Sequence, residues 1–156
     1  YMDGGDFEAR AEMSFASLSG GIALANARLG AVHGLAGPLG GSFPIAHGAA
    51  CAALLAPVCE ANIRALRERS PESPVLGRYS ELAALVSGSS KAVAEDLVPA
   101  LRELSSRLGI RPLCSFGIFP EAFPELVTSA MASSSMRGNP ICLFPAEVEA
   151  ILNAIG

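Results

Sequence analysis

The sequence has no tryptophan, only two histidines and few charged residues, and these shortages narrow what the chain can be. Charged residues make up 17% of it while 51% is hydrophobic, a balance that excludes intrinsic disorder. The formal net charge is −4, which argues against nucleic acid or an anionic membrane as a partner. With 156 residues, the chain is long enough for one domain with a real core.

Signals for export and for membrane insertion are also missing. No apolar run reaches the roughly 18 residues that a spanning helix needs, because Gly, Pro, His or Arg interrupts each one. There is no basic start followed by an apolar stretch, so no secretory signal is visible. We therefore expect a cytoplasmic protein without a membrane partner. The first residue is Tyr1 rather than Met, so a processed product or a fragment is expected.

The four cysteines lack any C-x-x-C spacing, and each has apolar neighbours in the sequence. Disulfides are possible in principle. The more ordinary interpretation is that they are buried, reduced thiols acting as small hydrophobic residues. They are Cys51, Cys59, Cys114 and Cys142.

Helix-forming patterns dominate the chain, and good strand signals are almost absent. From Asp6 onward, apolar residues at three- and four-residue steps predict a helix whose apolar face holds Phe7, Ala11, Phe15, Leu18 and Ile22. The paired Gly20 and Gly21 within it indicate close approach of another backbone.

A glycine-rich stretch follows between residues 30 and 41. It predicts a short helix over residues 31–36 that ends at Gly37-Pro38, and then a tight loop through Gly40 and Gly41. A new helix is expected to open near residues 42–45, with Pro44 in its first turn and a bend at Pro57.

The rest of the chain predicts four more helices. They cover roughly residues 75–86, 93–108, 124–132 and 145–155, and Gly88 and Gly109 are placed to end the first two. The apolar stripe of the second consists of Val93, Leu97, Leu101, Leu104 and Leu108. The predicted fold is an all-α bundle of six or seven helices that forms one domain over residues 1–156.

Most sequence motifs that carry chemistry are absent. There is no Walker loop, G-x-S-x-G elbow, H-E-x-x-H motif or cysteine-rich zinc pattern, and the glycines do not follow a strand as a dinucleotide fingerprint requires. What remains is His33 and His47, which flank the same glycine-rich loop. If that loop doubles back, two neutral imidazoles can meet at one transition metal.

His47 is expected in the first turn of a helix, where the helix dipole disfavours imidazolium and leaves a lone pair available. The alternative is that both histidines are hydrogen-bonded core residues. Two ligands also leave a catalytic metal site incomplete, since such sites usually have at least three protein ligands.

The segment GIALANARLGAVHGLAGPLGGSFPIAHGAACAALLAPV resembles the most distinctive part of the iron-containing alcohol dehydrogenase family, whose C-terminal domain has the dehydroquinate synthase-like fold. That part contains N-A-x-L-G, then H-x-x-x-H-x-L-G-G, then a histidine followed by glycine and an apolar helix with L-x-P. The tail SSSMRGNPICLFPAEVEAIL is similar to the family's closing stretch. The matching residues are Asn26, Ala27, Leu29, Gly30, His33, Leu39, Gly40, Gly41, His47, Gly48 and Pro57.

The resemblance implies part of a two-domain oxidoreductase acting on small alcohols or aldehydes. The family binds NAD or NADP mainly on an N-terminal nucleotide-binding domain, and holds a divalent metal, iron or sometimes zinc, with one Asp and three His on the helical domain. His33 and His47 match the last two of these ligands. The nucleotide-binding domain and the first two ligands would precede Tyr1 and are absent here, so the chain alone is expected to be inactive and to bind metal poorly. A homo-oligomer is also expected.

The chain departs from the family pattern at one position. The family's histidine near the nicotinamide falls at Gly37, which has no side chain to relay a proton. This departure favours the main alternative, a noncatalytic helical module for packing or oligomerisation that kept the fold. A third possibility is a helical regulatory or ligand-binding domain unrelated to dehydrogenases.

Overall fold

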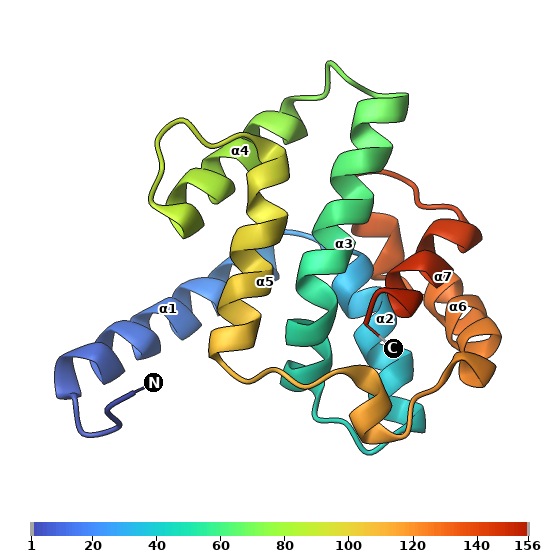
Figure 1. Ribbon diagram of the computed structural model, residues 1–156, viewed down its shortest axis with the longest axis horizontal. Helices are drawn as coiled ribbons and strands as arrows, with labels where there is room; N and C mark the ends of the chain where they lie inside the picture. Colours follow the sequence, from blue (N-terminus) through green and yellow to red (C-terminus); the bar gives the residue numbers. More distant parts are fainter. Residues whose placement is uncertain (1, 156) are drawn as a thin grey trace.

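The computed structural model describes residues 2–155, and within them it contains seven α-helices, four short 3-10 helices and no strand. The prediction of an all-α fold is confirmed (Figure 1). The α-helices are α1 (Phe7–Asn26), α2 (Ala31–Ser42), α3 (His47–Arg69), α4 (Pro74–Ser87), α5 (Leu97–Arg107), α6 (Phe123–Ala132) and α7 (Pro145–Asn153). The 3-10 helices are η1 (Ala94–Asp96), η2 (Leu113–Phe116), η3 (Pro120–Ala122) and η4 (Met136–Gly138).

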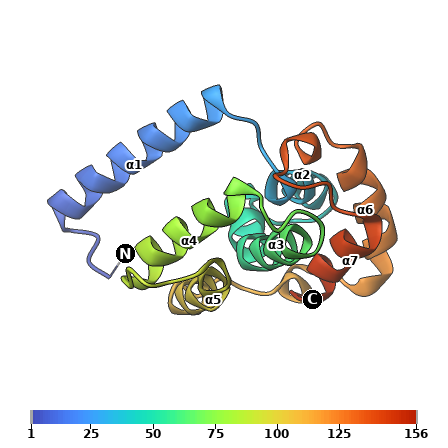
Figure 2. The same ribbon diagram turned by 90° about the horizontal axis from the view of Figure 1, so that it is seen from above.

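Helix α3 is the centre of the fold, with α2, α6 and α7 on one side of it and α4 and α5 on the other (Figure 2). Its small and apolar residues divide between two cores. Leu54 and Val58 pack toward α2, α6 and α7, whereas Ile63 and Leu66 pack toward α4 and α5. Burial on two faces explains why so many residues of this helix are apolar, whereas Glu60 and Arg64 remain exposed.

The same composition makes α3 the one described helix that is long and apolar enough to cross a membrane, with a mean hydropathy of 1.4 over its most apolar window. From the sequence, no stretch is expected to be long and apolar enough to span a membrane, and α3 does not meet that expectation. Of that window, 56% is buried inside the fold. The burial accounts for its apolar character without a membrane, because core helices meet the same test of length and composition.

Helix α2 is longer than predicted, and here the sequence interpretation was wrong. The helix does not end at Gly37-Pro38 but continues through Gly40 and Gly41 to Ser42. Leu35 and Leu39 lie on its inner face and are completely buried, so packing outweighs the poor helix propensity of glycine and proline.

Helix α3 correspondingly begins at His47 rather than near residues 42–45. Phe43 and Ala46 are extended, and the buried Ile45 anchors this short connection in the core. Pro44 therefore precedes the helix instead of lying in its first turn. Pro57 lies inside α3, which continues past it to Arg69.

Helix α1 forms where the sequence predicts it and is capped by the side chain of Asp6, which accepts a hydrogen bond from the Ala9 N–H. None of its residues is buried, however, and it extends away from the other helices (Figure 2). Added Cβ atoms at Gly20 and Gly21 would meet nothing within 4 Å, so the close backbone approach predicted there is not observed.

The later helices agree with their predicted positions. Gly88 and Gly109 have φ values of 72° and 67°, the left-handed conformation that commonly ends helices. In the predicted stripe of the fifth helix, Leu97 and Leu101 are buried, but Val93 precedes the helix and is half exposed.

The cysteines differ from expectation in their burial. All four are free thiols, as predicted, but only Cys59 is buried; Cys51 is half-buried, and Cys114 and Cys142 are exposed. Burial raises the pKa of the Cys59 thiol to about 11, so this side chain stays protonated and inert near neutral pH.

Candidate metal centre

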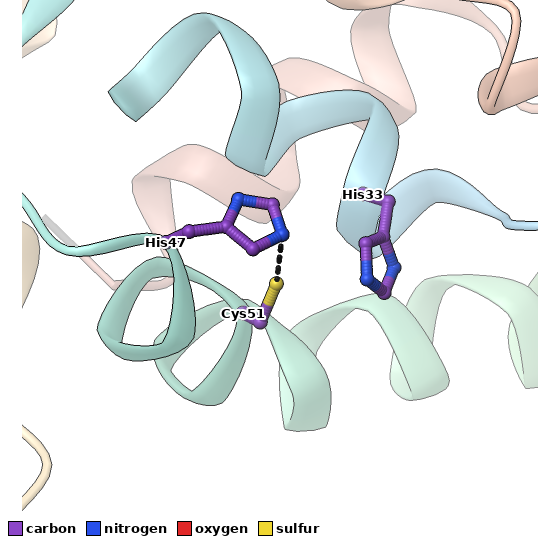
Figure 3. Close-up of side chains that lie close together, drawn as sticks. All are labelled: His33, His47 and Cys51. Carbon is purple, nitrogen blue, oxygen red and sulfur yellow. Dashed lines mark hydrogen bonds between the residues drawn. The ribbon is translucent and has the colours of Figure 1, made fainter. Parts of the chain in front are cut away.

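The structure brings the imidazole rings of His33 and His47 together, with ring centroids 5.4 Å apart and ring planes inclined by 49° (Figure 3). His33 lies in the first turn of α2 and His47 is the first residue of α3. The predicted convergence is therefore observed, whereas the role of the two rings as metal ligands stays a prediction.

The connection that brings them together is shorter and more ordered than the predicted glycine loop. It consists of residues 43–46, in which the Phe43 N–H donates to the Leu39 carbonyl and the Ile45 N–H donates to the Phe43 carbonyl. Helices α2 and α3 then pack directly against each other, with Ala31, Ala36 and Ala50 buried in their shared core. Such small residues let two helix backbones approach closely.

Neither ring behaves as a core histidine, because His33 is half-buried and His47 is exposed. Burial lowers the pKa of His33, and the nearby His47 lowers it further. In the absence of metal, the His33 ring is therefore neutral over more of the physiological pH range than an ordinary histidine. A neutral ring keeps the lone pair that a metal requires.

A third donor, missed by the sequence interpretation, lies beside the histidines. Cys51 is one turn after His47 on α3, and its Sγ lies 3.5 Å from Nε2 of His47 (Figure 3). One nitrogen from each ring and this sulfur all lie within 4.8 Å of one another. The sequence does contain a pattern that indicates this donor. Cys51 follows His47 by four residues in a predicted helix, and this spacing places both side chains on one face of the helix.

The position of His33 depends on a polar network at the start of α2. Asn139 accepts a hydrogen bond from the Ala31 N–H through Oδ1, at 3.0 Å, and its Nδ2 donates to Oδ1 of Asn62 at 2.6 Å. Asn62 is buried and also donates to the hydroxyl of Tyr79. This network joins the first turn of α2 to α3, α4 and the segment after η4.

Two glycines allow this network to form. A Cβ at Gly30 would lie 2.9 Å from Oδ1 of Asn139, and a Cβ at Gly138 would collide with the carbonyl oxygen of Leu29. Only glycine fits at positions where backbones or buried polar atoms approach this closely. Asn139, which belongs to the N-P pair of the tail, therefore helps to fix the first turn of α2, although it lies far from His33 in the sequence.

Gly37, predicted to lie near a nicotinamide, is exposed and lies one turn after His33 on α2. An added Cβ would meet nothing within 4 Å there. A surface hollow of about 340 Å³ adjoins His33 and is lined also by Leu24, Ala27 and Leu29 at the junction of α1 and α2. A hollow therefore lies beside His33, and the surroundings of Gly37 are open.

The donors present are suited to a divalent transition metal. Imidazole nitrogens bind iron and zinc alike, and a thiolate adds affinity for the softer of these ions. No carboxylate joins the His33, His47 and Cys51 cluster within residues 2–155. The chain therefore offers up to three donors of its own to a metal.

Comparison with known proteins places this chain in a family. The model of the Fe-containing alcohol dehydrogenase family, C-terminal, matches residues 1–156. Alcohol dehydrogenase 4 of Saccharomyces cerevisiae is 35% identical over 153 residues, which are 97% of this chain and 38% of the yeast protein. The 1,3-propanediol dehydrogenase of Klebsiella pneumoniae is 34% identical over 143 residues, 88% of this chain and 35% of that protein.

Solved structures agree with the sequence relatives. The alcohol dehydrogenase of Oenococcus oeni superposes with a TM-score of 0.82 at 28% identity, over 99% of this chain and 39% of that one. A 1,3-propanediol oxidoreductase superposes with a TM-score of 0.80 at 28% identity, over 98% of this chain and 39% of that one. The chain thus spans a little over a third of the length of these proteins. It belongs to the iron-containing alcohol dehydrogenase family and corresponds to its C-terminal, helical part.

Proposed function

We propose that this chain is the metal-binding part of an NAD(P)-dependent oxidoreductase that interconverts small alcohols and aldehydes. The observation that carries the proposal is the convergence of His33 and His47, 5.4 Å apart between ring centroids, in a chain of this family. The unrelated regulatory domain considered from the sequence is wrong, because the family match covers the whole chain.

In this proposal, His33 and His47 hold a divalent metal, iron or zinc, together with an Asp and a His that the family resemblance places before Tyr1. The bound metal supplies Lewis-acid chemistry, which polarises an alcohol or carbonyl oxygen. The chain's own residues fix the two imidazoles: α2 and α3 pack together, and Asn139 holds the first turn of α2. NAD or NADP would bind mainly to the nucleotide-binding domain typical of the family.

Gly37 distinguishes this chain from the family pattern. Because it has no side chain and its surroundings are open, no residue at this position can donate or relay a proton. We propose that water occupies this place beside the substrate, and that substrate choice differs from that of relatives with histidine here. Cytoplasmic location and assembly into a homo-oligomer also remain proposals.

Metal content tests the proposal directly. The 156-residue chain, which carries two of the four proposed ligands, should bind ferrous iron or zinc weakly, and the metal retained at equilibrium in a dialysis experiment is measured by mass spectrometry. His47→Ala and His33→Ala should each lower the retained metal by roughly tenfold or more, as loss of metal-site groups typically does. Glu68→Ala, which removes an exposed carboxylate on the same helix, serves as the control and should change nothing.

The result that contradicts the proposal is equal metal content in the two histidine variants and the unchanged chain, with helical circular dichroism preserved. A second measurement concerns turnover. The chain with added metal and NAD should oxidise no alcohol measurably, because the proposal assigns the nucleotide and two ligands to other segments. Robust turnover by the chain alone would contradict that assignment.

A further inference from the structure

Cys51 points at the same place as the two histidines, and nothing in the family resemblance assigns it a role. We propose that, in this chain by itself, its thiolate is a third metal ligand beside His33 and His47, where it takes one of the positions that the proposed function assigns to ligands preceding Tyr1. The inference rests on the proposed function, because it requires that His33 and His47 bind a metal. It goes further by naming an additional ligand and the class of metal that this ligand selects.

The geometry at His47 and Cys51 matches that of a shared metal. In a tetrahedral zinc site, a nitrogen about 2.0 Å and a sulfur about 2.3 Å from the ion lie about 3.5 Å from each other. The observed separation between Nε2 of His47 and Sγ of Cys51 is 3.5 Å. The helix produces this spacing, because residues four apart lie above one another on one face.

His33 completes the set from the neighbouring helix. Its ring nitrogen lies within 4.8 Å of the other two donor atoms, whereas a tetrahedral ion needs about 3.3–3.5 Å. A side-chain rotation of His33 covers the difference, since the ring is only half-buried and open space adjoins it. Cys51 is itself half-buried, so the sulfur is accessible to an entering ion.

Coordination by Cys51 replaces one bond with another. The S–H bond breaks, an S–metal bond forms, and the proton leaves to solvent, so binding of one ion releases one proton from this residue. A thiolate favours softer ions, so we expect preference for zinc or cobalt over iron relative to a site with only imidazole and carboxylate donors. Cys51 is thus a residue that sets metal specificity.

Cobalt(II) provides a readout that does not depend on activity. The full chain loaded with cobalt should show the intense near-ultraviolet charge-transfer band of a thiolate ligand. Cys51→Ser should lose this band and bind zinc roughly tenfold or more weakly. Cys114→Ser, which alters an exposed thiol in η2, should keep both the band and the zinc affinity.

A second measurement uses the unchanged Cys51, so its result does not depend on whether a Cys51 variant folds. Zinc should slow the alkylation of Cys51 by iodoacetamide at least roughly tenfold, as followed by peptide mass spectrometry, while Cys114 in the same sample reacts at an unchanged rate. His47→Ala should abolish this protection. Equal alkylation rates of Cys51 with and without zinc would overturn the inference.

The outcomes separate this inference from the proposed function. If cobalt binds and requires His47 but gives no thiolate band, Cys51 is no ligand, and the histidine site stands without it. If neither cobalt nor zinc binds at millimolar concentration, both the histidine site and the third ligand are contradicted.

Discussion

Helix α1 and the α2–α3 pair have similar compositions but opposite environments. All three helices are rich in small residues, alanine or glycine, and all carry large apolar side chains. In α1, Phe15 and Leu18 are 72% and 61% exposed, whereas Leu35 of α2 and Leu54 of α3 are completely buried. Apolar periodicity therefore predicts that a helix forms, but it does not say which surface covers its apolar face.

The difference matters because an apolar face stabilises a fold only when another surface covers it. Helices α2 and α3 cover each other and share their core with α6 and α7. No segment of residues 2–155 covers α1 in this way, and none of its residues is buried. The two regions should therefore respond differently to the same substitution.

The largest contrast is expected for leucine truncation. Leu54→Ala should lower the free energy of unfolding by about 2–5 kcal/mol, because it opens a cavity in the core. Leu18→Ala, the matched change in α1, should alter it by no more than about 0.5 kcal/mol. Urea unfolding followed by circular dichroism measures both. Equal losses would mean that α1 packs against the core in solution.

A smaller contrast is expected for asparagine. Asn139→Ala leaves the Ala31 N–H and Oδ1 of the buried Asn62 without a partner, at a cost of about 1–3 kcal/mol. It should also weaken metal binding, because it frees the turn that carries His33. Asn26→Ala removes only an exposed bond to the Ile22 carbonyl in α1 and should cost less than about 0.5 kcal/mol. An Asn139→Ala chain with unchanged stability and metal affinity would remove Asn139 from the supporting network.

The smallest contrast concerns glycine. Gly37→Ala should stabilise the chain by about 0.5–1 kcal/mol, because alanine is the better helix former and its Cβ meets no other atom within 4 Å. Gly20→Ala in α1 meets open space as well, but it should raise only local helix content without shifting the main unfolding transition. A shift of the main transition by Gly20→Ala would show that α1 unfolds together with the core.

Much of the fold could be predicted from the sequence, since α1 and α4 to α7 match their predicted segments in position and Gly88 and Gly109 end helices as expected. The boundary between α2 and α3 could not. Gly37, Pro38 and Gly40 are poor helix formers, and only the burial of Leu35 and Leu39 against distant helices keeps them helical. That information lies in tertiary contacts and not in local propensity.

The candidate site was predictable in part. The spacing and resemblance singled out His33 and His47, and the structure brings them together, although through a short extended connection rather than a glycine loop. Cys51 was missed because its apolar neighbours suggested a buried thiol. Asn139 could not be linked to the site from sequence alone, since its contact with Ala31 joins residues 108 positions apart.

The central claim is that His33 and His47 bind one and the same metal ion, and a zinc titration observed by nuclear magnetic resonance tests it most directly. The sequence has only these two histidines, so their imidazole nitrogen signals can be assigned with a single His47→Ala variant. The account predicts that both rings shift together and that both changes follow one binding curve with a single affinity. Signals that shift separately, or a single ring that responds while the other does not, would contradict a shared site.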